Sequence, residues 1–285
     1  MPVAGRTAAT TSTAYSCALG DELRRLREKF TPLTGHAFAE QLGWDPSKVS
    51  NIEKGKARAS EIDLVQYLMT CGRDTGCFEE FRARYRHAFD PSVLVAPADL
   101  RPLTLAEAQA TKVTSYDVLT VPALLQTPDY ARALLESGHR PAAEVEKCLR
   151  RLMDRQEALR WPNSPECPFY VHELALRLRV GDEKVMADQY LRMLFATHTA
   201  RPTSSTHNAR TVRIVPTAAG PGPVRASPRT LLSFEKLAPL AYGELAVGNV
   251  FTHDGGSIAD SREFFKWVDA IALDEGSSRR FLESL

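Results

Sequence analysis

Apolar residues recur at helical spacing through the first quarter of the chain, in short runs that glycine and polar residues separate. The first run places Leu19, Leu23, Leu26 and Phe30 on one side, because residues three or four apart share a helix face. Three further runs follow before residue 72, and each is short enough to be one small helix. The pattern predicts a bundle of short helices, with one more helix after it.

The fourth run predicts a helix that begins after Ser60. Asp63 stands three residues later, which is the spacing of a capping box. We expect this helix to bury the apolar residues Ile62, Val65, Leu68 and Met69.

The third run has only two aliphatic residues, Val49 and Ile52, in two turns of helix. Asp45 is expected at the N-cap and Pro46 at the first helical position, where a fixed φ costs nothing. Gly55 suits the left-handed conformation that often ends a helix. The segment therefore predicts a helix with a narrow apolar side and a wide polar face.

The polar face of this helix, residues 46–54, carries the side-chain types that bond base edges and phosphates in DNA. Ser47 and Asn51 are expected to contact base edges, whereas Glu53 is expected to bond back into the bundle. Basic residues continue into the following loop, where they can contact phosphates. The predicted DNA-binding residues are His36, Ser47, Lys48, Ser50, Asn51, Lys54, Lys56 and Arg58. The alternative is a solvated helix in a small bundle.

Beyond residue 103 the pattern becomes mixed. Residues 104–160 keep helical spacing and end in a long amphipathic segment, AAEVEKCLRRLMDRQEALRW. Short β-branched or aromatic runs then predict strands at PFYVHELAL, TVRIVP, LLSF, AYGEL and VGNVF, with a helix between the first two. Proline and glycine are too frequent in residues 216–230 for either element, so a loop is expected there. Two amphipathic helices are predicted to end the chain.

These elements predict a mainly α protein, in which an N-terminal helix-turn-helix bundle precedes a larger α+β domain with a small sheet. Residues 1–17, rich in Ala, Thr and Ser, are expected to form a disordered tail. The helix-turn-helix domain is expected at 18–90, a proline-rich linker at 91–103 and the C-terminal domain at 104–285.

Composition narrows the possible classes of protein. The net charge is +1, so a DNA-binding surface must be a local basic patch. Five cysteines without a C-x-x-C spacing argue against a disulfide framework or a zinc site and favour the cytoplasm. No apolar stretch approaches the roughly 20 residues of a membrane span, so no membrane association is expected.

No enzymatic site is expected. The sequence shows no paired carboxylates, no nucleophile with a nearby base and no cluster of metal ligands at a characteristic spacing. Gly220 and Gly222 do not form a phosphate-binding loop, because no G-K-[ST] follows them. We therefore predict no catalytic residue, no metal and no cofactor.

The segment LGDELRRLREKF…AFAEQLGWDPSKVSNIEKGKARAS resembles the Cro/repressor-type (Xre) helix-turn-helix. The rest of the chain is similar to the domain of unknown function that follows such a helix-turn-helix in many actinobacterial regulators. The similar pieces are VPALLQTPDYARALL, RLMDRQEAL, HELALR, VRIVP and AYGEL. The resemblance implies transcription regulation, and some similar proteins resemble antitoxins that are paired with a small protein from a neighbouring gene.

The chain departs from the family pattern at a few positions. Ala123 stands where the family usually has Gly, Lys54 where it has Asn, and Ala59 where it has Pro. Gly35 and His36 replace the Gln-like residues that often begin the second helix. These departures affect the operator that is recognised more than they affect the fold, and Lys54 favours a phosphate contact.

The run LLQTPDYA is the most specific piece of the second domain. Gln126 and Thr127 can cap the helix that Pro128 begins, and Tyr130 can line a pocket; the alternative is a helix start with a buried stripe. Charged and aromatic residues elsewhere add to the possible contacts. The candidate partner or ligand residues are Gln126, Tyr130, Arg155 and Tyr242.

The sequence thus predicts a sequence-specific DNA-binding transcriptional regulator. It is expected to be a homodimer that reads an inverted repeat in double-stranded DNA, with a C-terminal domain that dimerises and binds a small-molecule effector or a partner protein. The alternative is an antitoxin-like module that mainly binds a small protein encoded nearby and uses DNA binding for autoregulation.

Overall fold

A computed structural model describes residues 12–95, 101–138, 140–158, 164–198, 210–235, 237–245 and 248–285. The chain divides into two compact units, residues 1–93 and 94–285. The predicted fold class is confirmed, because a helical region precedes a mixed α+β region. Within the described residues, no helix combines the length and the apolar character that crossing a membrane requires.

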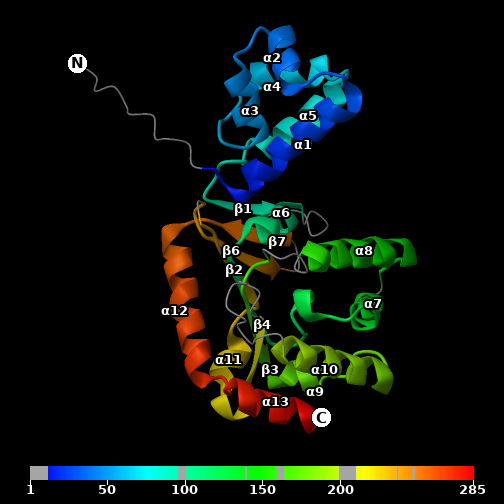
Figure 1. The fold of residues 1–285 in the computed structure, drawn as a ribbon, viewed down its shortest axis with the longest axis vertical. Helices are drawn as coiled ribbons and strands as arrows, with labels where there is room; N and C mark the ends of the chain where they lie inside the picture. Colours follow the sequence, from blue (N-terminus) through cyan, green and yellow to red (C-terminus); the bar gives the residue numbers. More distant parts are fainter. Residues whose placement is uncertain are drawn as a thin grey trace, which may run out of the picture. The chain divides into compact units, whose positions relative to one another are not determined.

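The N-terminal unit is a bundle of short helices around an apolar core that includes Leu23, Phe38, Ile52 and Tyr67 (Figure 1). Its helices are α1 (Ala14–Phe30), α2 (Gly35–Leu42), α3 (Pro46–Glu53), α4 (Glu61–Thr70) and α5 (Thr75–Tyr85).

Helix α1 begins earlier than the predicted end of the tail. Thr13 is its N-cap and forms a capping box with Ser16, so residues 12–17 are ordered by local hydrogen bonds. The Thr13 hydroxyl also donates to the carbonyl of Ala88, which ties the start of α1 to the end of this unit. The predicted tail of residues 1–17 was therefore too long, and its first eleven residues lie outside the described part.

The prediction for α4 placed the wrong face in the core. Ile62, Val65 and Met69 are 72%, 37% and 47% exposed, and only Leu68 of the four predicted residues is buried. Tyr67 sets the orientation of the helix, because its ring is buried and its hydroxyl reaches polar partners inside the bundle. A count of aliphatic residues could not reveal that a tyrosine occupies the core.

The C-terminal unit contains most of a seven-stranded mixed sheet with helices on both faces. Its helices are α6 (Arg101–Gln109), α7 (Pro128–Ser137), α8 (Ala142–Ala158), α9 (Glu173–Arg177), α10 (Glu183–His198), α11 (Pro221–Arg225), α12 (Gly255–Ile271) and α13 (Glu275–Glu283), with the short 3-10 helices η1 (Ala123–Leu125) and η2 (Thr217–Ala219). The strands are β1 (Ser92–Val95), β2 (Lys112–Asp117), β3 (Cys167–His172), β4 (Arg210–Val215), β5 (Arg229–Ser233), β6 (Leu240–Leu245) and β7 (Gly248–Thr252).

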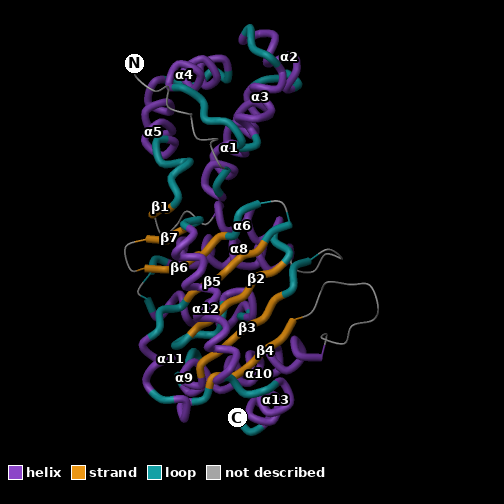
Figure 2. Tube along the Cα trace, turned by 90° about the vertical axis from the view of Figure 1, so that its left-hand side faces the viewer, coloured by secondary structure: helices purple, strands orange, loops and turns teal. Residues whose placement is uncertain are grey.

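The strands lie in the order β1-β7-β6-β5-β2-β3-β4, as Figure 2 shows. Strand β2 runs parallel to β3 and antiparallel to β5, and β3 runs parallel to β4. Strand β6 runs antiparallel to both of its neighbours, β5 and β7. The connections therefore bring β2 into the middle of the sheet, between strands from later parts of the chain.

Four segments differ from the predicted elements. The predicted strand PFYVHELAL ends at His172, and its last four residues belong to the helix α9. Residues 104–160 were expected to be helical, but the helix α6 ends at Gln109 and the chain continues as β2, which is paired on both sides and largely buried. The predicted linker 91–103 contains β1 and the start of α6, and its residues 96–100 lie outside the described part. The predicted loop 216–230 holds η2, α11 and the start of β5.

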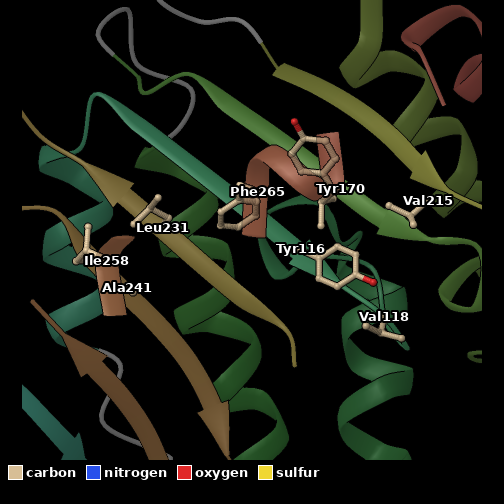
Figure 3. Close-up of a cluster of buried hydrophobic side chains, with 9 residues drawn as sticks. Tyr116, Val118, Tyr170, Val215, Leu231, Ala241, Ile258 and Phe265 are labelled. Carbon is tan, nitrogen blue, oxygen red and sulfur yellow. The ribbon is translucent and has the colours of Figure 1, made fainter. Parts of the chain in front are cut away.

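The two faces of the sheet are covered by different helices. Figure 1 shows α12 along one face and α7 and α8 on the other. Under α12 lies an apolar cluster that includes Tyr116, Tyr170, Leu231 and Phe265 (Figure 3). The opposite face carries the next residues of the same strands, because successive side chains point to opposite sides.

Candidate nucleic-acid interface

Helices α2 and α3 are joined by a turn of three residues. Thr34 caps α2, and Gly43 ends it in the left-handed region with φ 67°. Asp45 then caps α3 by accepting a 2.7 Å hydrogen bond from the Ser47 backbone N–H, with Pro46 at the first helical position. Hydrogen bonds from Ser47 hold the pKa of the Asp45 carboxyl below its usual value. These caps define a helix-turn-helix, and the sequence predicted the cap at Asp45 with Pro46 after it.

Helix α3 is seated tightly against α1 by two glycines. A Cβ on Gly20 would lie 2.6 Å from the carbonyl oxygen of Ile52, so the backbones of α1 and α3 approach too closely for a side chain. Gly55 has φ 65°, and its carbonyl accepts a 2.9 Å hydrogen bond from the Ser16 hydroxyl. The buried side chains of Val49 and Ile52 complete the contact. These contacts fix the direction in which the polar face of α3 points.

A buried polar network holds the last turn of α3. The Arg27 guanidinium donates to both carboxylate oxygens of Glu53, at 2.7 and 3.0 Å. The Tyr67 hydroxyl is 2.6 Å from Glu53 Oε1 and 3.1 Å from the carbonyl oxygen of Leu23. The hydrogen bonds from Arg27 to Glu53 raise the pKa of the guanidinium, and burial raises the pKa of the Tyr67 hydroxyl. Glu53 thus bonds back into the bundle, as the sequence predicted, and its charge is neutralised inside.

The outward face of α3 carries Ser47, Asn51 and Lys54, which are all exposed and stand at the spacing of one helix face. Lys56 follows in the loop and is also exposed. Neither lysine makes an ion pair with any residue that the structure describes. Ser50 is half-buried at the edge of this face. The face therefore combines a hydroxyl, an amide and free ammonium groups.

The other predicted DNA-binding residues already have partners. Lys48 is half-buried; its ammonium group donates to Asp63 at 2.6 Å and lies 4.1 Å from the centre of the Trp44 ring. The Arg58 guanidinium is 4.0 Å from an Asp90 oxygen. His36 is exposed near the start of α2, and its Nε2 is 3.4 Å from Glu40. A phosphate contact from these residues would compete with the contacts within the protein.

The candidate residues of the C-terminal unit do not all come together. Gln126, Arg155 and Tyr242 line one cavity of about 210 Å³. Tyr130 is fully buried and is not among the lining residues, and its hydroxyl accepts a hydrogen bond from the backbone N–H of Val121. Thr127 caps α7 as predicted, whereas the Gln126 amide instead donates to the carbonyl of Val121.

Three acidic residues at the same cavity were not singled out from the sequence: Glu107, Asp117 and Glu244. Glu107 is bonded to Arg155, so the charged pair could be suspected only once α6 and α8 were known to pack together. Asp117 ends a strand that the sequence pattern assigned to a helix. The signal that identifies it is the strand register, which a single sequence does not contain.

Two domains of known families match the chain. Residues 18–80 match a helix-turn-helix domain, and residues 100–284 match a domain of unknown function, DUF5753. A search of curated proteins and a search of solved structures each found no match. The helix-turn-helix match runs from within α1 to within α5 and includes the face described above, and it suggests DNA binding.

Proposed function

The chain belongs to the DUF5753 family, and from that premise we propose that it is a sequence-specific transcriptional regulator that binds double-stranded DNA. The helix-turn-helix match supports DNA binding, and the resemblance of its sequence to the Xre type of actinobacterial regulators supports a role in transcription. The observation that carries the proposal is the exposed face of α3, where Ser47, Asn51 and Lys54 project from a helix that is fixed on its other side.

In the proposed complex α3 lies in the major groove. Asn51 has the amide geometry that recognises adenine through two hydrogen bonds, and Ser47 can bond either to a base edge or to a phosphate. Lys54 and Lys56 neutralise phosphates, which supplies affinity without sequence information. The buried neutralisation of Glu53 keeps an acidic charge away from this surface.

We further propose that the regulator is a homodimer in which two copies of α3 read an inverted repeat. One two-turn helix contacts too few base pairs to select a single site, and a second copy about one helical turn of DNA away, roughly 34–36 Å, doubles the information. We assign the dimer contacts to the C-terminal unit, because the helices of the N-terminal unit serve to position α3.

The C-terminal unit is proposed to bind an effector or a partner protein. A unit of 192 residues, from 94 to 285, is larger than dimerisation alone requires, and it contains a cavity lined by charged groups. The second candidate function is an antitoxin-like module that mainly binds a small protein encoded nearby, with DNA binding for autoregulation. The resemblance of the sequence to such regulators favours it.

The proposal includes a cytoplasmic location and no catalytic activity, since the role assigned to the chain is binding. The test is to incubate the full chain with sheared genomic DNA of its host, recover the bound fragments and sequence them. We expect the fragments to share one inverted repeat, and DNase I footprinting should protect it. Fragments without a common motif, or no retained DNA, would contradict the proposal.

A further inference from the structure

The cavity in the C-terminal unit lies between the sheet and the segment that leads into α7. Strands β2, β5 and β6 contribute one wall, and η1 with the residues around it contributes another. Much of the lining is apolar, with Val121, Pro122, Leu124 and Leu134 among the contributing residues. Its volume of about 210 Å³ is below the range of roughly 300–1,000 Å³ for drug-sized ligands, so the cavity suits a small molecule.

The strand register places a row of polar side chains on the cavity side of the sheet. Ser115 of β2 pairs with Thr230 of β5, and Thr230 pairs with Tyr242 of β6. The Ser115 and Thr230 hydroxyl oxygens are 3.2 Å apart, so both face the same way. Asp117 and Glu244 each stand two residues further along their strands, and alternation puts them on this same face.

The basic residue inside the cavity is already neutralised. The Arg155 guanidinium donates to the two carboxylate oxygens of Glu107 at 2.8 and 2.7 Å, and both side chains are buried. The other basic residue of the lining, Arg229, pairs with Tyr116 on the opposite face of the sheet, and its guanidinium lies 4.0 Å from the centre of the Phe264 ring under α12. Arg155 is thus hydrogen-bonded to Glu107 and has a weaker electrostatic interaction with Glu244, and neither guanidinium is paired with Asp117.

Of the three acidic residues in the described lining, Asp117 and Glu244 are left once Glu107 is paired with Arg155. Glu244, which is exposed at the cavity mouth, accepts a 2.9 Å hydrogen bond from the Tyr242 hydroxyl. The Asp117 carboxyl has neither a hydrogen bond nor an ion pair to any residue that the structure describes. Burial, and secondarily the charge of Glu244, raise the pKa of Asp117 well above its ordinary value. An ionised carboxylate beside apolar side chains is unfavourable without a counter-charge, and either a proton or a cationic group can neutralise it.

We propose that this cavity binds a small organic cation, a primary ammonium ion with a short aliphatic body. The ammonium group pairs with Asp117, Glu244 supplies a second acceptor at the mouth, and the aliphatic part packs on Pro122 and Leu124. The proposal rests on the proposed function in one respect, since such a cation would be the effector that the C-terminal unit recognises.

The lining favours an organic cation over other small ligands. A calcium ion takes six to eight oxygen ligands, whereas in the described lining only Asp117 and Glu244 are acids without an ion pair, and they lie beside apolar side chains. An anion would meet these two carboxylates and a guanidinium that Glu107 already occupies. A neutral alcohol of the same shape would leave the Asp117 carboxylate without a counter-charge.

The test is isothermal titration calorimetry on the full chain with n-butylammonium, using butan-1-ol and butyrate as neutral and anionic molecules of the same shape. We expect heat of binding for the ammonium ion alone. Asp117→Asn should weaken its affinity by at least about tenfold, because a buried charge pair loses one member. Glu244→Gln should weaken it less, since that group is exposed. The matched control is Asp154→Asn on the exposed side of α8, which should bind as the parent does.

Equal binding of butylammonium and butanol, undiminished binding by Asp117→Asn, or no binding of butylammonium would each overturn the proposal. Circular dichroism on the same samples establishes that the variants are folded. Retention of DNA fragments is measured in parallel and should be unchanged in Asp117→Asn without ligand. A chain that binds the ammonium ion but no DNA would contradict the regulator function alone, and a chain that binds DNA but no ammonium ion would contradict only the cavity assignment.

Discussion

In the N-terminal unit the buried Glu53 carboxylate is bonded to Arg27 and Tyr67, whereas in the C-terminal unit the Asp117 carboxyl faces a cavity and has no bonding partner among the residues that the structure describes. Both units also bury a glutamate–arginine pair with two hydrogen bonds, so their interiors tolerate charge in the same way. The two units differ in whether a further carboxyl group is left without a partner in the described part of the chain. The network around Glu53 has all its hydrogen bonds and serves to position the exposed face of α3. The Asp117 carboxyl lacks such a partner, so a ligand can supply the positive group there.

Removing Arg27 from the Glu53 network should have the largest effect on stability. Arg27→Ala leaves the Glu53 carboxylate buried without its counter-charge, and we expect the N-terminal unit to lose about 3–5 kcal/mol of stability. Urea unfolding followed by circular dichroism measures this loss. The control is Arg24→Ala, at an exposed arginine on the same helix, which should change stability by less than about 0.5 kcal/mol. Similar unfolding midpoints for the two variants would show that the network contributes little.

The exposed face that this network positions should account for operator choice. Asn51→Ala is expected to cost about 1–3 kcal/mol of binding at the operator and to relax the preference at one base pair, because the bidentate contact is lost. Binding is measured by fluorescence anisotropy on the operator and on its single-base variants. A loss that is equal on operator and unrelated DNA would exclude a base contact by Asn51.

In the C-terminal unit, removing the ionisable group of Asp117 should raise the stability of the folded state. The raised pKa of Asp117 means that the folded state binds its proton more tightly than the unfolded chain does, so ionisation opposes folding as the pH rises above about 4. Asp117→Asn removes this penalty. We expect a melting temperature about 2–4 °C higher at pH 7, as about 1 kcal/mol produces in a domain of this size, and no gain below pH 4.

Differential scanning fluorimetry across this pH range measures the effect, with Asp154→Asn as the exposed control. A melting temperature that falls at pH 7 in Asp117→Asn would mean that the carboxylate has a stabilising partner. The comparison between the two units would then lose its basis.

The smallest expected effect distinguishes two lysines on α3. Lys54 has no ion-pair partner within the described residues, whereas Lys48 already donates to Asp63. Lys54→Ala should reduce the slope of log affinity against log salt by about 0.9, the value for one phosphate contact, on operator and unrelated DNA alike. Lys48→Ala should reduce it by less. Anisotropy titrations at several salt concentrations measure the slopes, and a larger change for Lys48 would reverse the assignment.

The sequence was sufficient to predict the helix-turn-helix and its orientation, because the signals are local. Asp45, Pro46 and Gly55 mark the ends of α3, and the two aliphatic residues indicate which side is buried. The predicted face of α4 was wrong because Leu64 and Tyr67 are buried beside Leu68, and the polar hydroxyl of Tyr67 is satisfied by a glutamate from another helix.

The cavity could not be predicted in the same way. Asp117 and Glu244 are separated by more than a hundred residues, and they come together only through the pairing of β2, β5 and β6. Strand β2 itself was hidden, since a strand paired on both sides buries consecutive residues and lacks the alternation of a half-exposed strand. Gln126, Arg155 and Tyr242 were chosen from the sequence, but it contained no sign that they share one site.

The two glycines that seat α3 have a consequence for how such a protein can diverge. Gly20 and Gly55 are confined to glycine by backbone contacts, whereas Ser47, Asn51 and Lys54 have no packing role. Descendants of this chain can therefore exchange the residues that face DNA and acquire a new operator without any change in the scaffold. A library randomised at the three exposed positions should yield mostly folded proteins, and one randomised at the two glycines should yield almost none.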